Sequence, residues 1–241
     1  MKFKLLFVAM AVMFTTTSYG QFGKLIDKAK KVVSGEEGLS QLDASNGLKE
    51  ALQLGVDEAV TQLSVDKGYL ESPYKILLPE EAQKVSSKLQ VVPGFKGWEE
   101  DVILKMNQAA EIAAKKATPI FVDAIKQMTF EDAVNIVRGD NDAGTRYLEE
   151  KSQSKLYDAF LPIIQATLDE VNIRDLWSKG VNAYNKVQLF GGKVNPDLDD
   201  HVNNMALVGM FGLIEQKEEG VRTDLDQQSS DLLKKVFGSE E

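Results

Sequence analysis

Apolar residues recur most regularly between Trp98 and Val137, where their spacing predicts three consecutive helices. The first helix has a narrow apolar face made mostly of alanine, and such a face lets a neighbouring helix approach closely. Its members are Ile103, Met106, Ala109, Ala110, Ala113 and Ala117. Thr118 and Pro119 follow. We expect the second helix to begin there, because threonine is a good N-cap and proline suits the first helical position.

The third helix of this stretch has a start pattern of its own. Thr129 is followed three residues later by Asp132, which is the spacing of a capping box. The apolar face expected behind it consists of Phe130, Ala133, Val134 and Val137.

The same periodicity predicts further helices on both sides of this stretch. They cover residues 46–64, 79–89, 143–171, 173–187, 198–219 and 229–238. Pro162 lies inside one of them, and we expect a kink or a restart there because proline removes a backbone hydrogen bond. Residues 205–214 are apolar on every side, so they should belong to the core. Since no alternating strand pattern occurs, the chain is predicted to be all-α, a single bundle of about eight or nine helices.

One segment between the predicted helices breaks the helical pattern. Gly68, Pro73 and Pro79 interrupt residues 67–79, which we therefore expect to form an extended, ordered loop. Its larger apolar side chains should point inward. These are Tyr69, Tyr74, Ile76 and Leu77.

The first twenty residues have the pattern of a secretory signal peptide. Lys2 and Lys4 precede an apolar run over residues 5–14, and a small-x-small site ends at Gly20. We expect cleavage between Gly20 and Gln21 and a protein that is exported, either periplasmic or secreted. The chain has no cysteine, so neither a lipoprotein anchor nor a disulfide can form. No other segment reaches the roughly 20 apolar residues that a transmembrane helix needs.

These patterns divide the chain into three regions. The signal peptide covers residues 1–20, a short amphipathic helix and a linker cover 21–44, and an all-helical domain covers 45–238. The short helix carries lysines opposite its apolar face. Two interpretations stay open for it: packing on the domain or a partner, or binding to a membrane surface, as basic amphipathic helices do.

The chain is acidic, with a formal net charge of -9. Loss of the two lysines in the signal peptide leaves 26 Lys and Arg against 37 Asp and Glu, a net charge of -11. The remaining lysines are interleaved with acids. This pattern opposes nucleic-acid binding, because phosphate backbones require clustered Lys and Arg.

The only histidine lies in the most suggestive group of polar residues. Asp197 and His201 are one helical turn apart, with Asp200 beside them. Such a group could hold a divalent cation in a metal-binding protein or an enzyme. The alternative is that these acids gather at a helix N-terminus and complement its dipole.

Asp140 and Asp142 form a second candidate for a metal site, because oxygen ligands at alternate positions suit calcium. The EF-hand pattern fails, since Thr145 stands where glycine is required and Lys151 where glutamate is required. Two interpretations remain, a calcium site of another kind and an N-cap role for Asp142.

No motif of a known enzyme class occurs, whether a Walker loop, GxSxG, HExxH or a GxGxxG loop between a strand and a helix. We therefore assign no catalytic residues and no cofactor. The chain does carry a surplus of aromatic residues and methionines, which either form the core or line an apolar ligand cavity. They are Tyr69, Tyr74, Phe95, Trp98, Met106, Met128, Phe160, Trp177, Phe190, Met205, Met210 and Phe211.

Several segments in this order resemble a bacterial family. They are LKEALQLGVDEAV at 48–60, SPYKILLP at 72–79, AAEIAAKKATPIFVDAIKQMTFEDAVNIVRGDNDAGTRYL at 109–148, FLPII at 160–164 and SSDLLKKVFG at 229–238. Together they resemble the family known as domain of unknown function 4197, over residues 45–238. Members are exported, helical and often lipoproteins, although this chain lacks the lipoprotein cysteine. The resemblance implies fold and location, and it implies no activity, cofactor or site residues.

The combined expectation is a non-catalytic, exported binding or scaffolding protein. Its ligand would be a protein partner in the envelope or an apolar small molecule. The alternative is an enzyme or metal-binding protein with an acidic site around Asp197, Asp200 and His201.

Overall fold

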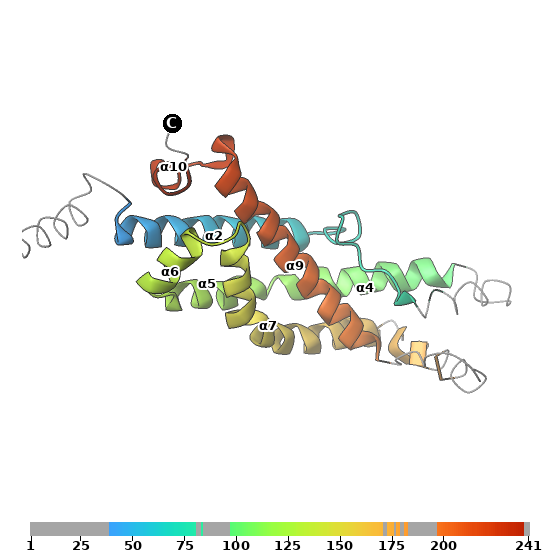
Figure 1. Ribbon diagram of the computed structural model, residues 1–241. Helices are drawn as coiled ribbons and strands as arrows, with labels where there is room; N and C mark the ends of the chain where they lie inside the picture. The colour runs from blue at the N-terminus through green and yellow to red at the C-terminus, as the bar shows by residue number, and fades with distance from the viewer. Residues whose placement is uncertain are drawn as a thin grey trace, which may run out of the picture. The chain divides into compact units, whose positions relative to one another are not determined.

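Helices make up all the regular structure of the described residues. The computed structural model describes residues 39–80, 83, 97–170, 173–175, 177–178, 181–182 and 197–238, with Trp98 described by its backbone alone. The helices are α2 (Gln41–Leu63), α4 (Trp98–Ala114), α5 (Ala117–Gln127), α6 (Phe130–Val137), α7 (Ala143–Glu170), α9 (Leu198–Thr223), the 3-10 helix η1 (Leu225–Gln227) and α10 (Asp231–Phe237) (Figure 1). The prediction of an all-α fold is confirmed. None of the helices in these ranges is long and apolar enough to cross a membrane.

The chain divides into two units, residues 1–40 and residues 41–241, and the rest of this description concerns the second. Its central element is α9, which packs against α7, α2 and α4 and crosses them in Figure 1. Helix α4 packs chiefly on α7, while α2 also contacts α5, α6 and α10. The predicted signal peptide and short amphipathic helix lie outside the described residues.

The predicted alanine face of α4 is part of the core. Ala109, Ala110 and Ala113 are fully buried, and Met106 is buried beside them. The apolar segment of α9 is also core, where Phe211 meets Phe121 of α5 edge to face with ring centroids 5.6 Å apart. These small and large side chains fill the space between the central helices.

The α9 segment differs from the prediction in one respect. Val208 is 58% exposed, so this part of the helix is not buried on every side. Gly209 and Gly212 allow close approach to the loop that follows α2: a Cβ atom on either glycine would lie under 3.0 Å from Tyr74. Tyr69 of the same loop is fully buried and donates a hydrogen bond from its hydroxyl to the Ala206 carbonyl, 2.7 Å away.

The loop after α2 forms turns over residues 64–74 and is irregular only over 75–79, so the predicted extended loop is confirmed only in part, and one inward residue was assigned wrongly. Ile76 is buried, and its backbone N–H and carbonyl both bond to the side chain of Asn107 at 2.9 Å. Leu77 is 49% exposed, whereas Leu78 is buried. Successive side chains of an extended segment point to opposite sides, so Ile76 and Leu78 share the inner side.

The boundary between α4 and α5 also differs from the prediction. Helix α5 begins at Ala117 with Lys116 as N-cap, so Thr118 is helical and Pro119 is the third helical residue. The buried position of Ala117 explains the early start, since the core contact begins there. Proline is tolerated because the first N–H groups of a helix have no partner within it.

The capping box of α6 is confirmed, and its apolar face is partly wrong. The Asp132 N–H donates to the Thr129 hydroxyl at 3.1 Å, and the Thr129 N–H donates to the Asp132 carboxylate at 3.0 Å. Ala133 and Ile136 are buried, whereas Phe130 is 56% exposed. Helical side chains lean toward the N-terminus, so the first residue of α6 projects past the helix end.

Helix α7 runs without interruption through Pro162, so no restart occurs there. Pro162 lies on the exposed side, where solvent can bond the carbonyl that lacks a backbone partner. Helix α2 begins at Gln41, five residues before its predicted start. In the predicted helix of 173–187, the described residues are helical, and Ile173, Trp177 and Val181 among them are buried.

Candidate functional site

The acidic residues at the start of α9 serve the helix itself and its neighbours. Asp197 is the N-cap, and its carboxylate accepts the Asp200 N–H at 3.4 Å. The His201 Nε2 lies 2.8 Å from the Leu77 carbonyl, and it must donate there because a carbonyl only accepts. His201 is therefore bound to the loop after α2.

The other two acids of this group have separate partners. Asp200 accepts a hydrogen bond of 2.6 Å from the Tyr157 hydroxyl, and this bond, together with burial, raises the pKa of Tyr157 to about 12. Asp199 is buried and forms an ion pair with Arg174 of 2.7 Å. Within the described ranges, no group of three or more His, Asp or Glu side chains is placed to hold a metal ion.

Asp140 and Asp142 lie in the turn before α7. Asp142 precedes the first residue of α7 and so occupies the N-cap position, where its carbonyl accepts the Arg146 N–H at 2.9 Å. Its carboxylate accepts from the Arg146 guanidinium at 3.1 Å. Asp140 is exposed, and its carbonyl accepts the Ala143 N–H. Asp142 thus stands at the predicted position, but its carboxylate pairs with Arg146, and the N–H groups of Gly144 and Thr145 that an N-cap side chain would bond are bonded by Glu218 instead.

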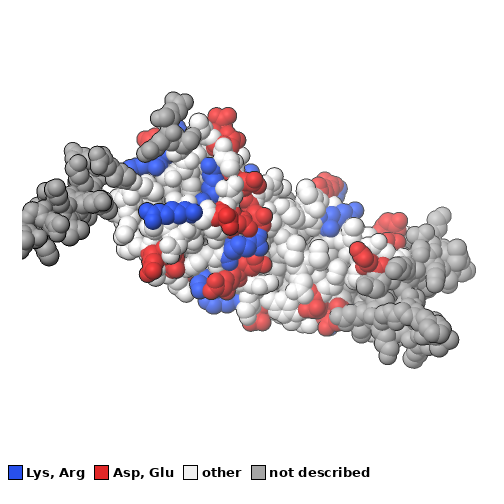
Figure 2. All heavy atoms as spheres, in the orientation of Figure 1, with Lys and Arg blue, Asp and Glu red and all other residues white. Residues whose placement is uncertain are grey.

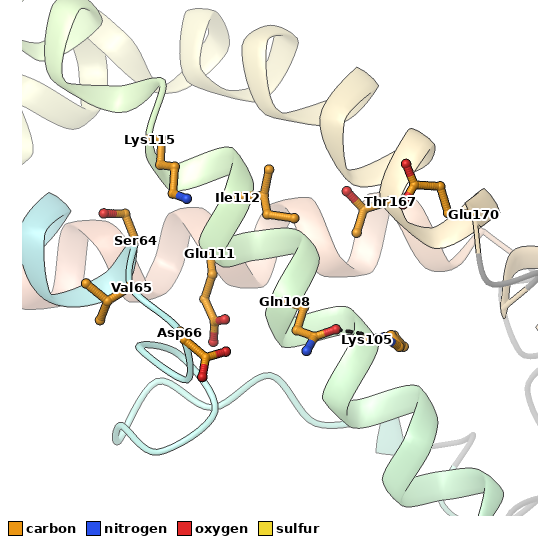
Figure 3. Close-up of a pocket in the computed structure, with 10 residues that line it drawn as sticks. All are labelled: Ser64, Val65, Asp66, Lys105, Gln108, Glu111, Ile112, Lys115, Thr167 and Glu170. Carbon is orange, nitrogen blue, oxygen red and sulfur yellow. Dashed lines mark hydrogen bonds between the residues drawn. The ribbon is translucent and has the colours of Figure 1, made fainter.

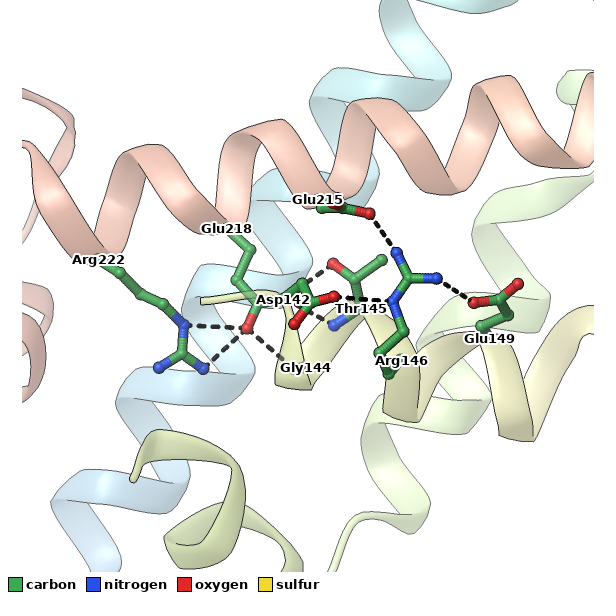
Figure 4. Close-up of polar contacts among 8 residues, drawn as sticks. All are labelled: Asp142, Gly144, Thr145, Arg146, Glu149, Glu215, Glu218 and Arg222. Carbon is green, nitrogen blue, oxygen red and sulfur yellow. Dashed lines mark hydrogen bonds and ion pairs between the residues drawn. The ribbon is translucent and has the colours of Figure 1, made fainter. Parts of the chain in front are cut away.

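A buried ion pair of α9 lies next to this turn and was not predicted. Glu218 is 2% exposed and accepts hydrogen bonds from the N–H groups of Gly144 and Thr145 at 2.8 and 2.6 Å. It also accepts from the Thr145 hydroxyl at 2.7 Å and from Arg222 at 2.8 Å. Figure 4 shows Glu218 reaching from α9 to the start of α7. Its carboxylate thus bonds N–H groups that have no partner inside α7.

Arg222 extends the same contact to the end of α6. Its guanidinium donates to the carbonyls of Ile136 and Val137 at 3.0 and 3.2 Å, and it lies 5.3 Å from the Phe237 ring centroid. In the sequence, Glu218 and Arg222 read only as an i, i+4 surface pair. Their partners are more than 70 residues away, so no local pattern could indicate them.

A pocket of about 310 Å³ lies between the loop after α2, α4 and the end of α7 (Figure 3). Charged residues of both signs line it, as do two aliphatic residues: Asp66, Lys105, Glu111, Lys115, Glu170, Val65 and Ile112. Glu111 is 5% exposed, and its carboxylate accepts the N–H groups of Tyr69 and Leu70. Burial raises the pKa of Glu111, and the nearby charge of Asp66 adds to this effect. We refer to this space as the Glu111 pocket.

A second, larger space lies between α2 and α9. It has a volume of about 560 Å³ and is bounded by Leu54, Gly55 and Glu58 of α2, by Val221 of α9 and by Ser229 before α10, among others. Leu54 is 41% exposed. Glu58 forms an ion pair of 2.5 Å with Lys217 across the space. We refer to it as the α2–α9 groove.

Of the surplus aromatic residues and methionines, the nine whose side chains the structure describes line neither the Glu111 pocket nor the α2–α9 groove. Seven of them are buried in the hydrophobic core, and Tyr74 and Met205 pack against it. The seven are Tyr69, Met106, Met128, Phe160, Trp177, Met210 and Phe211. The remaining side chains, those of Phe95, Trp98 and Phe190, lie outside the described residues.

The described helices form an all-α domain that extends across most of the chain, and the buried Glu218–Arg222 ion pair lies within it. The chain belongs to the family described as "Protein of unknown function (DUF4197)", whose model matches residues 38–238. The predicted family is therefore confirmed. No curated protein and no solved structure matches the chain.

Proposed function

We propose that this protein is an exported, non-catalytic module that binds a protein partner. The proposal rests on the position of the Glu111 pocket and of the α2–α9 groove. The two described spaces lie on the surface beside exposed aliphatic side chains, at Val65 and Ile112 in one case and at Leu54 in the other. Among the described residues, the large side chains of Tyr69, Phe160, Trp177 and Phe211 are instead buried in the core. Exposed apolar side chains in a polar rim suit a protein interface.

Two further observations support a binding role. The acids at the start of α9 cap their helix or pair with Tyr157 and Arg174, which accounts for them without catalysis. On the face drawn in Figure 2, basic and acidic side chains are interspersed, and both signs of charge are available to pair with complementary charges of a protein partner. Export rests on the N-terminal pattern of lysines, an apolar run and a small-x-small site.

Photo-crosslinking in intact cells of the native host tests the proposal. A photoreactive amino acid is placed at Ile112, at Leu54 and, as a control away from both spaces, at Phe130, which is 56% exposed. We expect one stoichiometric protein adduct from Ile112 or Leu54 and none from Phe130. The absence of an adduct from both positions would contradict the proposal.

A small polar ligand is the second candidate, because Glu111 places a buried carboxylate in a pocket of about 310 Å³. Pockets for small molecules start near this size, at about 300 Å³. Native mass spectrometry of the protein purified from its host decides between the two. A bound small mass that is lost on Glu111→Lys would favour this candidate, and a mass equal to the chain alone would exclude it.

A further inference from the structure

We infer that the α2–α9 groove binds an amphipathic helix of the partner, with apolar residues on one side and lysines on the other. This inference rests on the proposed function and names the chemistry of the partner. The protein already holds such a helix in the adjoining part of the same surface. That helix is α10.

Helix α10 shows which side chains this surface accepts. Its Leu233 is fully buried against Ala51 of α2 and Val221 of α9, in a small apolar cluster separate from the main core. Its Val236 lies on Gly47, where an added Cβ would be only 2.5 Å from the valine Cγ2 atom. Gly47 therefore lets an apolar helix approach α2 closely on this surface.

The groove continues this contact along the same face of α2. Gly47 and Ala51 lie under α10, while Gly55 and Glu58 line the groove, and these positions are three or four residues apart. Val221 belongs to both parts, since it contacts Leu233 and lines the groove. Ser229, just before α10, marks the transition. The groove is thus an unfilled extension of a surface that already binds a helix.

The shape and polarity of the groove fit apolar side chains. Leu54 is 41% exposed at its edge, and Val221 lies between the two helices. At Gly55, α2 and α9 lie at ordinary contact distance, because a Cβ placed there would be 3.6 Å from the Lys217 Cβ. A volume of about 560 Å³ leaves room for several aliphatic side chains of a docked helix.

Charge complementarity selects lysine for the other side of that helix. Lys235 of α10 pairs with Asp43 of α2 at 2.6 Å. Two acids, Asp57 and Glu58, line the groove against one lysine, Lys217, which pairs with Glu58 at 2.5 Å, so the lining has a net negative charge. A lysine of a docked helix would pair with Asp57, which is exposed, as Lys235 does with Asp43. An acidic helix would be repelled by the same residues.

Binding of two synthetic helices by the mature protein tests the inference. The first carries leucines on one face and lysines on the other, and the second carries glutamate in place of each lysine. Each has about 18 residues, because shorter isolated helices are marginal in water. Fluorescence anisotropy measures their affinity for the wild-type protein and for two variants. These variants are Leu54→Lys in the groove and Val208→Lys on α9, and Val208 is not among the groove residues.

We expect the wild type to bind the lysine helix at least about tenfold more tightly than the glutamate helix, a difference of about 1.4 kcal/mol. Leu54→Lys should weaken binding of the lysine helix about tenfold, and Val208→Lys should leave it unchanged. Both variants replace an exposed aliphatic residue and add one positive charge. A difference between them therefore reports the groove and not the net charge. Circular dichroism checks that both remain folded.

Three results would overturn the inference: no binding of either helix, equal binding by the two variants, or a preference for the glutamate helix. The crosslinking and helix-binding experiments together distinguish failure of this inference from failure of the proposed function. A stoichiometric adduct in cells from Ile112, without helix binding at the groove, would leave the proposed function standing and remove only the inference. No adduct from Ile112 or Leu54 would remove both.

Discussion

At the residue scale, the strongest dependence of stability on one side chain is expected at Glu218. Its carboxylate is buried and bonds two backbone N–H groups, a hydroxyl and Arg222. We expect Glu218→Gln to lower the free energy of unfolding by about 3 kcal/mol, because it leaves a buried guanidinium without its counter-charge. Denaturant titration of both proteins measures this difference.

Glu215 provides the matched control for that experiment. It lies one turn away on α9, forms an ion pair with Arg146 and is 43% exposed. Glu215→Gln should change the free energy of unfolding by less than about 1 kcal/mol, as is usual for exposed pairs. Equal effects of the two substitutions would contradict the structural role assigned to Glu218.

Glu111 should make stability depend on pH in the direction opposite to most carboxylates. Burial and Asp66 raise its pKa above the ordinary value of 4.5, so the folded state binds this proton more tightly than the unfolded state. Stability from this group is present at low pH and is lost as pH rises from about 4.5 through the raised pKa. Glu111→Gln keeps an acceptor for Tyr69 and Leu70 but cannot ionise.

The difference in unfolding free energy between the wild type and Glu111→Gln isolates this effect. We expect the wild type to lose stability relative to the variant as pH rises from 4.5 to 7. The comparison cancels the titration of the other carboxylates. A difference that is constant with pH, or that changes in the other direction, would contradict the raised pKa of Glu111.

At the element scale, two helical glycines should respond in opposite directions to alanine. A Cβ on Gly144 would be 2.8 Å from both the Glu218 carboxylate and the Leu52 side chain. Gly144→Ala should therefore destabilise the fold by about 1–3 kcal/mol through overpacking. A Cβ on Gly55 would meet its nearest neighbour at 3.6 Å, an ordinary contact. Gly55→Ala should stabilise α2 by about 0.5–1 kcal/mol. Thermal denaturation of both variants measures the two signs.

The packing of whole helices also explains which parts of the fold the sequence could predict. Periodicity located α4, α5, α6, α7 and α9, because each helix buries a stripe of apolar residues against its neighbours. Local chemistry correctly identified the capping box of α6. The predicted start of α5 at Thr118 and Pro119 was wrong, because the contact of Ala117 with the core determines where the helix begins. Leu77 was assigned wrongly because a short loop has no repeating apolar pattern that would show which of its side chains point inward.

The candidate sites were harder to predict because they arise only in the assembled molecule. Asp197, Asp200 and His201 are adjacent in sequence, yet the fold gives them separate partners. Glu218 meets the start of α7 from more than 70 residues away. The Glu111 pocket and the α2–α9 groove each need segments that are distant in the chain. Such features depend on how distant helices pack against one another, and local patterns in a single sequence do not show that packing.

At the scale of the whole molecule, α10 should add stability without being needed for the main core. Leu233 is buried in a cluster separate from that core, while Leu232, Val236 and Phe237 are only partly buried. Removal of residues 229–241 exposes the apolar surface under Leu233 and takes Phe237 from Arg222. We expect loss of about 2 kcal/mol, since full burial of one leucine contributes about 1.5–3 kcal/mol.

That loss should appear as a lower Tm with the helical content of the remaining chain preserved. For a domain of about 200 residues, 2 kcal/mol corresponds to a decrease of about 4–8 °C. Leu233→Ala in the full chain should reproduce most of the decrease, whereas Leu232→Ala should not, because only Leu233 is fully buried. Circular dichroism melts of the three variants measure both quantities. An unchanged Tm would show that α10 does not dock as described, and loss of the cooperative transition would show that the main core depends on it.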